Sequence, residues 1–198
     1  IPEIDEYPEI KPNYVMPEQQ GTWKPYDRNE KFVRYWAKPG TEGFMHRLGG
    51  LEKDYKTSAI STDPVNHEKM VRARQQKIDG IATDIPLLKV SGDSSADLLV
   101  VGWGGTYGHL YSAVEAMNAE GKPVAFAHFN YINPLPANTE EILRRYKKVV
   151  VCELNNGQFA SYLSGKVPGV NFLRYNKIQA QPFMVSELMA HFSKLLEE

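Results

Sequence analysis

Short, continuous apolar runs alternate with amphipathic segments in the second half of the chain, and this pattern restricts the fold more than any other feature. The expected strands are residues 97–102, 124–129, 148–154 and 171–175. The expected helices are residues 108–120, 138–146, 158–163 and 184–198. Strands that are apolar at every position need cover on both faces of their sheet, and the βα repetition supplies covering helices. We therefore predict an α/β fold, an open and mainly parallel sheet flanked by helices, over residues 91–198.

Local signals sharpen the bounds of these helices. Asn138 followed by Glu141 predicts a capping box at the start of one helix, and Gly121 is expected to end another. The last helix is the clearest, because its inner face repeats apolar residues at helical spacing. These residues are Val185, Leu188, Met189, Phe192 and Leu195.

The first 62 residues are rich in Pro, Gly, Tyr and charge and show no sustained periodicity, so we expect an extended arm with short elements. Asp63-Pro64 predicts a helix start, and an apolar face of Val71, Ile78, Ile81 and Ile85 continues to just before Pro86. Residues 91–95 are expected to be a loop. We therefore divide the chain into residues 1–90, an arm and helix packed on the core or on a neighbouring domain, and residues 91–198, the α/β domain.

Composition limits the classes of function. The 23 basic residues nearly balance the 24 acidic ones, so no broad positive surface for nucleic acid is expected. No apolar run approaches the roughly 18 residues that a membrane helix needs, and we expect a cytoplasmic protein. Because the chain starts at Ile1 rather than at methionine, we expect it to be a piece of a longer polypeptide.

Metal centres and nucleophiles are not indicated. Cys152 is the single cysteine, whereas an iron–sulfur cluster usually takes four thiolates, and its place within an apolar strand suggests an inert thiol. The histidines lack metal-ligand spacing, and no nucleophile elbow occurs. Gly92-Asp93-Ser94 lacks the rest of a thiamine and magnesium motif, so we interpret it as a linker. We predict no metal and no catalytic residue in this chain.

A glycine-rich loop follows the first predicted strand and opens a helix. Its residues Gly104, Gly105 and Thr106 could contact an anion or a partner, since backbone N–H groups at a helix start bind anions. The dinucleotide fingerprint is not completed, because Tyr107 stands where its third glycine would fall and no acidic residue follows the second strand. The glycines could equally serve tight turning and helix packing.

Two further loops carry polar side chains. Glu153, Asn155, Asn156 and Gln158 follow a strand, and they could form an interface with a ligand or subunit, or an ordinary Asn-Gly turn. His46 and Arg47 precede a Gly-Gly pair and could grip a carboxylate or phosphate, or could lie in a solvated loop.

An ordered set of short motifs resembles the α subunits of 2-oxoglutarate (2-oxoacid):ferredoxin oxidoreductases. The motifs are GTEG (40–43), HRLGGLEK (46–53), DP (63–64), NHEKM (66–70), GWGGT (102–106), PLP (134–136), ELNNGQ (153–158), Lys177 and QPF (181–183). The resemblance covers nearly the whole chain. It implies a domain similar to the C-terminal domain of transketolase-like enzymes.

The resemblance also implies an enzyme larger than this chain. Such enzymes oxidatively decarboxylate 2-oxoglutarate with coenzyme A to succinyl-CoA and reduce ferredoxin. They use thiamine diphosphate, magnesium and an iron–sulfur cluster. The implied partners are a pyrimidine-binding domain at the start of the α subunit, a β subunit, possibly γ and δ subunits, and ferredoxin.

For this chain the resemblance implies no bound cofactor and no activity of its own, only assembly and active-site support. Glu153→Ala is accordingly predicted to weaken subunit association. Two alternatives stay open, namely a stand-alone flavodoxin-like nucleotide- or anion-binding domain and a C-terminal domain of another thiamine enzyme, such as a pyruvate-specific relative.

Overall fold

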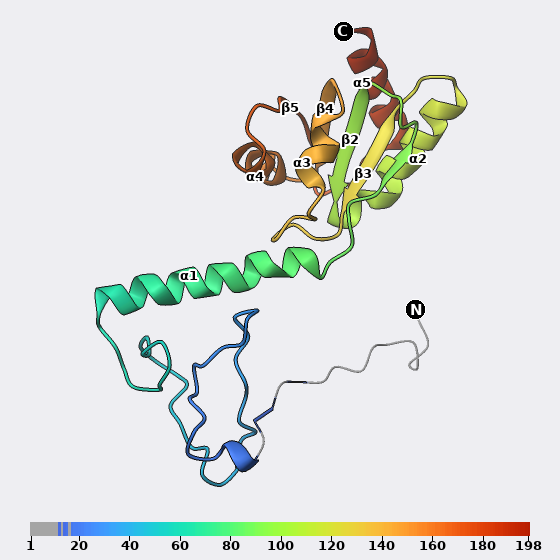
Figure 1. The fold of residues 1–198 in the computed structure, drawn as a ribbon. Coiled ribbons are helices and arrows are strands. Elements are labelled where there is room, and N and C mark those ends of the chain that lie inside the picture. The colour runs from blue at the N-terminus through green and yellow to red at the C-terminus, as the bar shows by residue number, and fades with distance from the viewer. Residues whose placement is uncertain (1–11, 13, 16) are drawn as a thin grey trace, which may run out of the picture. The chain divides into compact units, whose positions relative to one another are not determined.

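The computed structural model describes residues 12, 14–15 and 17–198 (Figure 1). The chain forms two compact units, Ile1–Ile81 and Ala82–Glu198, which we call the N-terminal unit and the sheet unit. The boundary expected from sequence, between residues 90 and 91, falls inside the first strand of the sheet.

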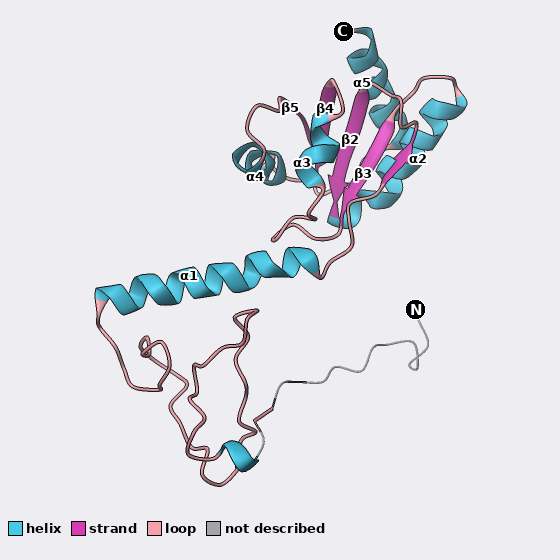
Figure 2. Cartoon of the chain, in the orientation of Figure 1, coloured by secondary structure: helices cyan, strands magenta, loops and turns pink. Residues whose placement is uncertain are grey.

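Five strands form the sheet (Figure 2): β1 (Val90–Gly92), β2 (Leu98–Trp103), β3 (Ala125–Phe129), β4 (Lys148–Glu153) and β5 (Phe172–Asn176). They lie in the order β1-β3-β2-β4-β5. Neighbours among β2, β3, β4 and β5 pair in parallel, and β1 pairs antiparallel with β3. The predicted open, mainly parallel sheet flanked by helices is therefore confirmed.

Helices cover both faces of the sheet. The face towards α2 (Tyr107–Ala119) and α5 (Val185–Glu197) buries Leu98 and Val100 of β2. The face towards α3 (Thr139–Arg144) and α4 (Gln158–Lys166) buries their neighbours Leu99 and Val101. Successive side chains of a strand point to opposite faces, so each apolar run supplies both layers of the core.

Two expectations for the sheet unit were wrong. Residues 91–95 do not begin as a loop, because Ser91 and Gly92 belong to β1 and pair with β3. Asn138 does not cap α3 with its side chain. Its Oδ1 instead accepts from the Leu88 N–H at 2.8 Å, and its Nδ2 donates to the Leu88 carbonyl at 3.0 Å. The side chain of Asn138 therefore bonds a residue 50 positions away instead of forming the predicted capping box.

The N-terminal unit contains a single long helix within the described residues, α1 (Pro64–Gly80). Asp63 caps it as predicted, with its carboxylate accepting from the Val65 N–H at 3.0 Å. The predicted apolar face was wrong at Val71 and Ile81, which are 45% and 37% exposed, and α1 ends at Gly80 rather than just before Pro86. The buried side of α1 is formed by Asn66, Met70 and Ala73. None of the helices in the described part of the chain is long and apolar enough to cross a membrane.

Candidate functional site at the carboxyl edge of the sheet

The glycine-rich loop after β2 makes a tight turn. Gly104 adopts a φ of +58°, which favours glycine, and the Thr106 hydroxyl donates to the Trp103 carbonyl at 2.9 Å. At Gly102 a Cβ atom would lie 2.3 Å from Cδ1 of Leu110, so α2 packs directly on this backbone. The glycines are therefore needed for the turn and for the packing of α2. The predicted anion or partner contact of Gly104, Gly105 and Thr106 stays a prediction.

Glu153, at the end of β4, points inward and is 1% exposed. Its carboxylate accepts from the backbone N–H groups of Phe159 at 2.9 Å and Ala160 at 3.0 Å, and from the Trp103 indole N–H at 3.2 Å. Phe159 and Ala160 are in the first turn of α4, where backbone donors lack helical partners and the helix dipole favours a negative charge. Glu153 therefore caps α4 from the neighbouring strand.

The rest of this loop divides between structure and surface. Asn155 Oδ1 accepts from the N–H groups of Gly157 at 2.8 Å and Gln158 at 3.2 Å, which fixes the turn. The side chains of Asn156 and Gln158 are exposed. Because Glu153 is buried, a role for it in an interface can only be indirect, through the shape of the loop.

His128, on β3, was not singled out from the sequence. It lies beside Gly102 in the parallel register and has Tyr107 edge-on at 5.1 Å. Burial lowers the pKa of its imidazole, and a hydrogen bond with the backbone of Gly104 acts in the opposite direction. The sequence could have indicated His128 only through its position opposite Gly102 on the neighbouring strand, and that position is not known until the register of β2 and β3 is known.

Cavities open at the same edge. One of about 670 Å³ is lined by Lys89, Val90, Ser91, Gly104, Tyr107, Phe126, His128 and Asn130. A smaller one, of about 230 Å³, is lined by Trp103, Ile132, Asn133, Gln158, Phe159 and Tyr162. The smaller pocket lies between β2 and α4, next to the cap formed by Glu153.

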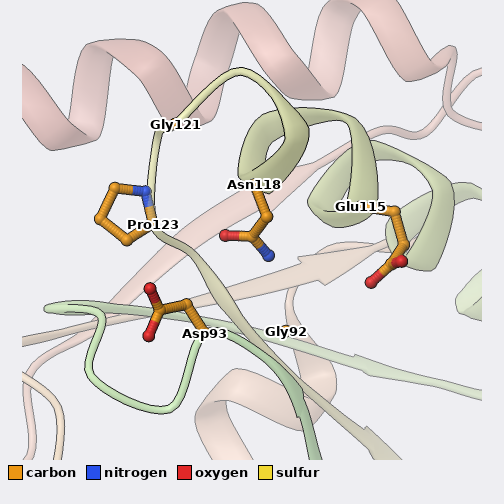
Figure 3. A pocket seen from close by; sticks show the side chains of 6 residues that line it. All are labelled: Gly92, Asp93, Glu115, Asn118, Gly121 and Pro123. Carbon is orange, nitrogen blue, oxygen red and sulfur yellow. The ribbon is translucent and has the colours of Figure 1, made fainter.

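A further cavity, of about 540 Å³, lies near the amino ends of the parallel strands (Figure 3). Its central side chain, Asn118, bonds both the N–H of Val124, at 2.8 Å, and its carbonyl, at 2.9 Å. Asp93 accepts from the backbone and the hydroxyl of Ser95, which lowers the pKa of its carboxyl group. Asn118 joins α2 to the segment before β3, and Asp93 fixes its own turn, so this cavity is not our candidate site.

The two remaining predicted contact residues, His46 and Arg47, belong to the N-terminal unit. His46 lies edge-on to Trp23 at 4.9 Å, and its Nδ1 bonds the Phe44 carbonyl at 2.8 Å. It lines a cavity of about 290 Å³ whose wall includes Trp23, Tyr35 and Trp36. Arg47 is exposed.

The described residues do not fit a metal or iron–sulfur centre. No group of three or more His, Cys, Asp or Glu side chains among them is arranged to hold a metal ion. Cys152 is fully buried in β4, and burial raises the pKa of its thiol well above the ordinary value.

No family model matches the sequence, but individual proteins do. The chain is 43% identical to 2-oxoglutarate oxidoreductase subunit KorA of Mycobacterium tuberculosis over 190 residues, which are 95% of this chain and 28% of that protein. It is 31% identical to the α subunit of 2-oxoacid:ferredoxin oxidoreductase 1 of Aeropyrum pernix over 137 residues, 66% of this chain and 21% of that one.

A solved structure agrees with the sequence matches. The 2-oxoglutarate:ferredoxin oxidoreductase of Magnetococcus marinus, with 2-oxoglutarate, coenzyme A and succinyl-CoA bound, superposes with a TM-score of 0.89 at 27% identity. The likeness covers 98% of this chain and 34% of that one.

Fold and sequence together therefore define a class, the 2-oxoacid:ferredoxin oxidoreductases. Within it, the chain belongs to the family of the α subunits and corresponds to a C-terminal part of them. The resemblance inferred from the motifs is confirmed. The chain spans about 28% of the M. tuberculosis relative, so it carries only a portion of what that subunit contains.

Proposed function

We propose that this chain is part of the α subunit of a cytoplasmic, thiamine-dependent 2-oxoacid:ferredoxin oxidoreductase. The whole enzyme converts 2-oxoglutarate and coenzyme A to succinyl-CoA and carbon dioxide and passes the electrons to ferredoxin. The match to the M. tuberculosis 2-oxoglutarate oxidoreductase subunit, 43% identical over 95% of the chain, carries this proposal. The ligands named for the M. marinus structure favour the same substrates over a pyruvate-specific reaction.

Within that enzyme we assign this region to assembly and active-site support. In sheets with this strand order, ligands ordinarily bind in the crevice at the carboxyl ends of the two strands where the order reverses, here β2 and β4. The carboxylate of Glu153 already occupies the N–H groups of Phe159 and Ala160 at this place. In a stand-alone nucleotide- or anion-binding domain, donors at this place would be free for the ligand.

The cofactors are accordingly assigned to other parts of the enzyme. Thiamine diphosphate, magnesium, the iron–sulfur cluster and coenzyme A would be held by a pyrimidine-binding domain of the α subunit, by a β subunit, and by γ and δ subunits where these are separate chains. Ferredoxin would dock outside this region. The surfaces that we assign to partner contacts are Gly104, Gly105 and Thr106, Asn155, Asn156 and Gln158, and His46 with Arg47.

A comparison of activities tests the proposal. The isolated chain, supplied with thiamine diphosphate, magnesium, 2-oxoglutarate and coenzyme A, should not reduce a viologen dye. The assembled oxidoreductase should reduce it in a reaction that depends on both 2-oxoglutarate and coenzyme A. Dye reduction by the isolated chain would contradict the supporting role, and an assembled enzyme that turns over pyruvate but not 2-oxoglutarate would contradict the assigned substrate.

A further inference from the structure

Exposed apolar side chains gather at one edge of the sheet, the carboxyl edge, to which the arrowheads of β2 and β3 point (Figure 2). The loops and helix starts at this edge expose Leu87, Tyr107, Tyr131, Ile132, Leu154, Ile178 and Met184 by 37% or more. Tyr111 lies one turn further along α2, and its ring stacks on Tyr107. Apolar side chains that are exposed together at one edge mark an interaction site more often than singly scattered ones do.

The loops at the same edge carry little formal charge. The loops that follow β2, β3, β4 and β5 there are residues 104–106, 130–138, 154–157 and 177–184, and their one charged residue is Lys177. Its ammonium group is paired with Glu187 at 2.7 Å and donates to the Pro182 carbonyl at 3.0 Å. The segment that enters β1 adds Asp84 and Lys89, and the first turn of α3 adds Glu140 and Glu141, which pair with Arg144 and Arg145. Depletion of charge is characteristic of the core of a protein–protein interface.

The opposite edge, at the amino ends of the parallel strands, has the reverse character. Its turns carry the charged residues Asp93, Asp97, Glu120, Lys122, Arg145 and Lys147. Lys147 pairs with Asp97 at 2.7 Å and Lys122 with Glu120 at 2.9 Å, with all four side chains largely exposed. Such pairs are typical of a solvated surface.

The carboxyl edge is also hollowed, with room for side chains of a partner. Beside the cavities of about 670 Å³ and 230 Å³, a third of about 360 Å³ is lined by Leu87, Tyr131 and Pro136 among others. The pocket of about 230 Å³ has a nearly apolar wall, formed by Trp103, Ile132, Phe159 and Tyr162. Interfaces gain most of their affinity where an apolar anchor fills a pocket of this kind.

We propose that the carboxyl edge docks on the remainder of the α-subunit polypeptide, through an aliphatic and aromatic surface that places one apolar side chain between Trp103, Ile132 and Phe159. This inference rests on the proposed function. The occupant follows from two observations: the chain spans only 28% and 34% of its relatives, and the edge has the apolar character of a permanent contact. A transient partner such as an electron carrier would be steered by charge, of which the loops at this edge have little.

Site-specific photocrosslinking in the assembled oxidoreductase tests the proposal. A benzophenone amino acid replaces Tyr131, which is 45% exposed at the carboxyl edge, and in the matched control it replaces Lys122, whose side chain is 45% exposed at the amino edge. After irradiation, mass spectrometry identifies the linked peptides. We expect a crosslink from position 131 to α-subunit residues outside this region, and no such crosslink from position 122.

Every other result overturns the proposal: a crosslink from position 131 to a different subunit or to a second copy of this chain, no crosslink, or equal crosslinking from both positions. Ile132→Asp adds a second measurement, since a charge in the docked edge should lower the melting temperature of the assembled enzyme, whereas Lys122→Asp should not. The dye assay on the unsubstituted enzyme is run separately, so failure of the proposed reaction and failure of the docking surface are distinguished.

Discussion

The interiors of the two units of this chain are stabilised by different forces. In the sheet unit, two apolar layers bury whole strands, and Leu98, Leu99, Val100 and Val101 are all fully buried. In the described part of the N-terminal unit, the buried apolar side chains are only Phe44, Met70 and Ala73. Lys53 and Asn66 are buried there instead, and each bonds backbone groups of the unit.

Polar contacts between distant segments thus stabilise the N-terminal unit, whereas apolar packing stabilises the sheet unit. Asn66 Nδ2 donates to the Lys53 carbonyl at 2.9 Å, and its Oδ1 accepts from the Tyr55 N–H at 2.8 Å. The Arg28 guanidinium donates to the Tyr55 carbonyl at 2.8 Å and lies over the Tyr55 ring. Such contacts are directional and individually replaceable, so we expect damage in this unit to stay local and damage in the sheet to spread.

The largest effect is expected for Glu153→Ala. The substitution leaves the N–H groups of Phe159 and Ala160 and the indole of Trp103 without their acceptor, which should cost about 3 kcal/mol of unfolding free energy for the sheet unit. Denaturant titration followed by far-UV circular dichroism measures this loss. Because the cap holds the start of α4 next to this loop, the predicted weakening of subunit association should accompany the loss of stability.

Two controls identify the cause of that loss. Glu153→Gln keeps one acceptor oxygen and should lose less stability than the alanine variant. Formate should partly restore the alanine variant, because the vacated N–H groups would donate hydrogen bonds to this small carboxylate. An alanine variant with unchanged stability would contradict the capping role.

Gly102→Ala should be the next largest in effect. Its methyl group would meet Leu110 Cδ1 at 2.3 Å and Thr106 Oγ1 at 2.9 Å, so these buried side chains must repack, at a cost of about 2 kcal/mol. The same denaturation experiment measures it. Gly108→Ala is the matched control, because no atom lies within 4 Å of the added methyl group. Equal stability of the two variants would refute close packing at Gly102.

Asn66→Ala should cost less, about 1 to 2 kcal/mol, and only locally. Hydrogen exchange should accelerate at the Tyr55 amide, whose acceptor is lost, while exchange in β2 and β4 stays unchanged. Asn156→Ala, at an exposed position, is the control and should change neither exchange at the Tyr55 amide nor exchange in β2 and β4. Faster exchange in β4 on substitution of Asn66 would show that the two units do not respond separately.

The smallest effects concern pH, and they differ between the units. Burial lowers the pKa of His128 and of His191 in the sheet unit below the ordinary value of 6.5. The unfolded chain then binds protons first, so stability is greatest above pH 6.5 and falls as the pH drops from there towards the folded pKa values. Melting temperatures between pH 8 and pH 5 should show this fall, and His128→Phe should reduce it.

In the N-terminal unit the corresponding group is Asp54. Hydrogen bonds from the backbone of Thr57 and Lys56 hold the pKa of its carboxyl group below 3.8. Its contribution is therefore present above that pH and is lost as the pH falls through the folded value. Hydrogen exchange at Thr57 should accelerate only in strong acid, and acceleration already near pH 6 would contradict the assignment of separate pH ranges.

Much of the sheet was predictable because its signal is local. β2, β3, β4 and β5 appear in the sequence as apolar runs, and their bounds lie within one or two residues of those expected. β1 was missed because Val90-Ser91-Gly92 contains a single apolar side chain and exists as a strand through its pairing with β3. The N-terminal unit offered no periodic pattern, since its order depends on contacts such as that of Asn66 with residues 11 and 13 positions away.

The candidate site was predictable in place but not in detail. Strand-end loops were identified from the parallel sheet pattern, and the loops containing Gly104 and Asn155 do lie at the carboxyl edge. The direction of the Glu153 side chain was not predictable, because its partner Trp103 is 50 residues away. His128 was missed for the same reason, since its importance arises from the register of β3 against β2.

The burial of Cys152 gives this chain a built-in reporter. A thiol with no exposed surface and a raised pKa does not react with alkylating or disulfide reagents until β4 is exposed. Because the sequence contains no other cysteine, every label on this chain records one such opening event. The kinetics of modification by a chromogenic disulfide would therefore time the opening of the central strands without any engineered probe.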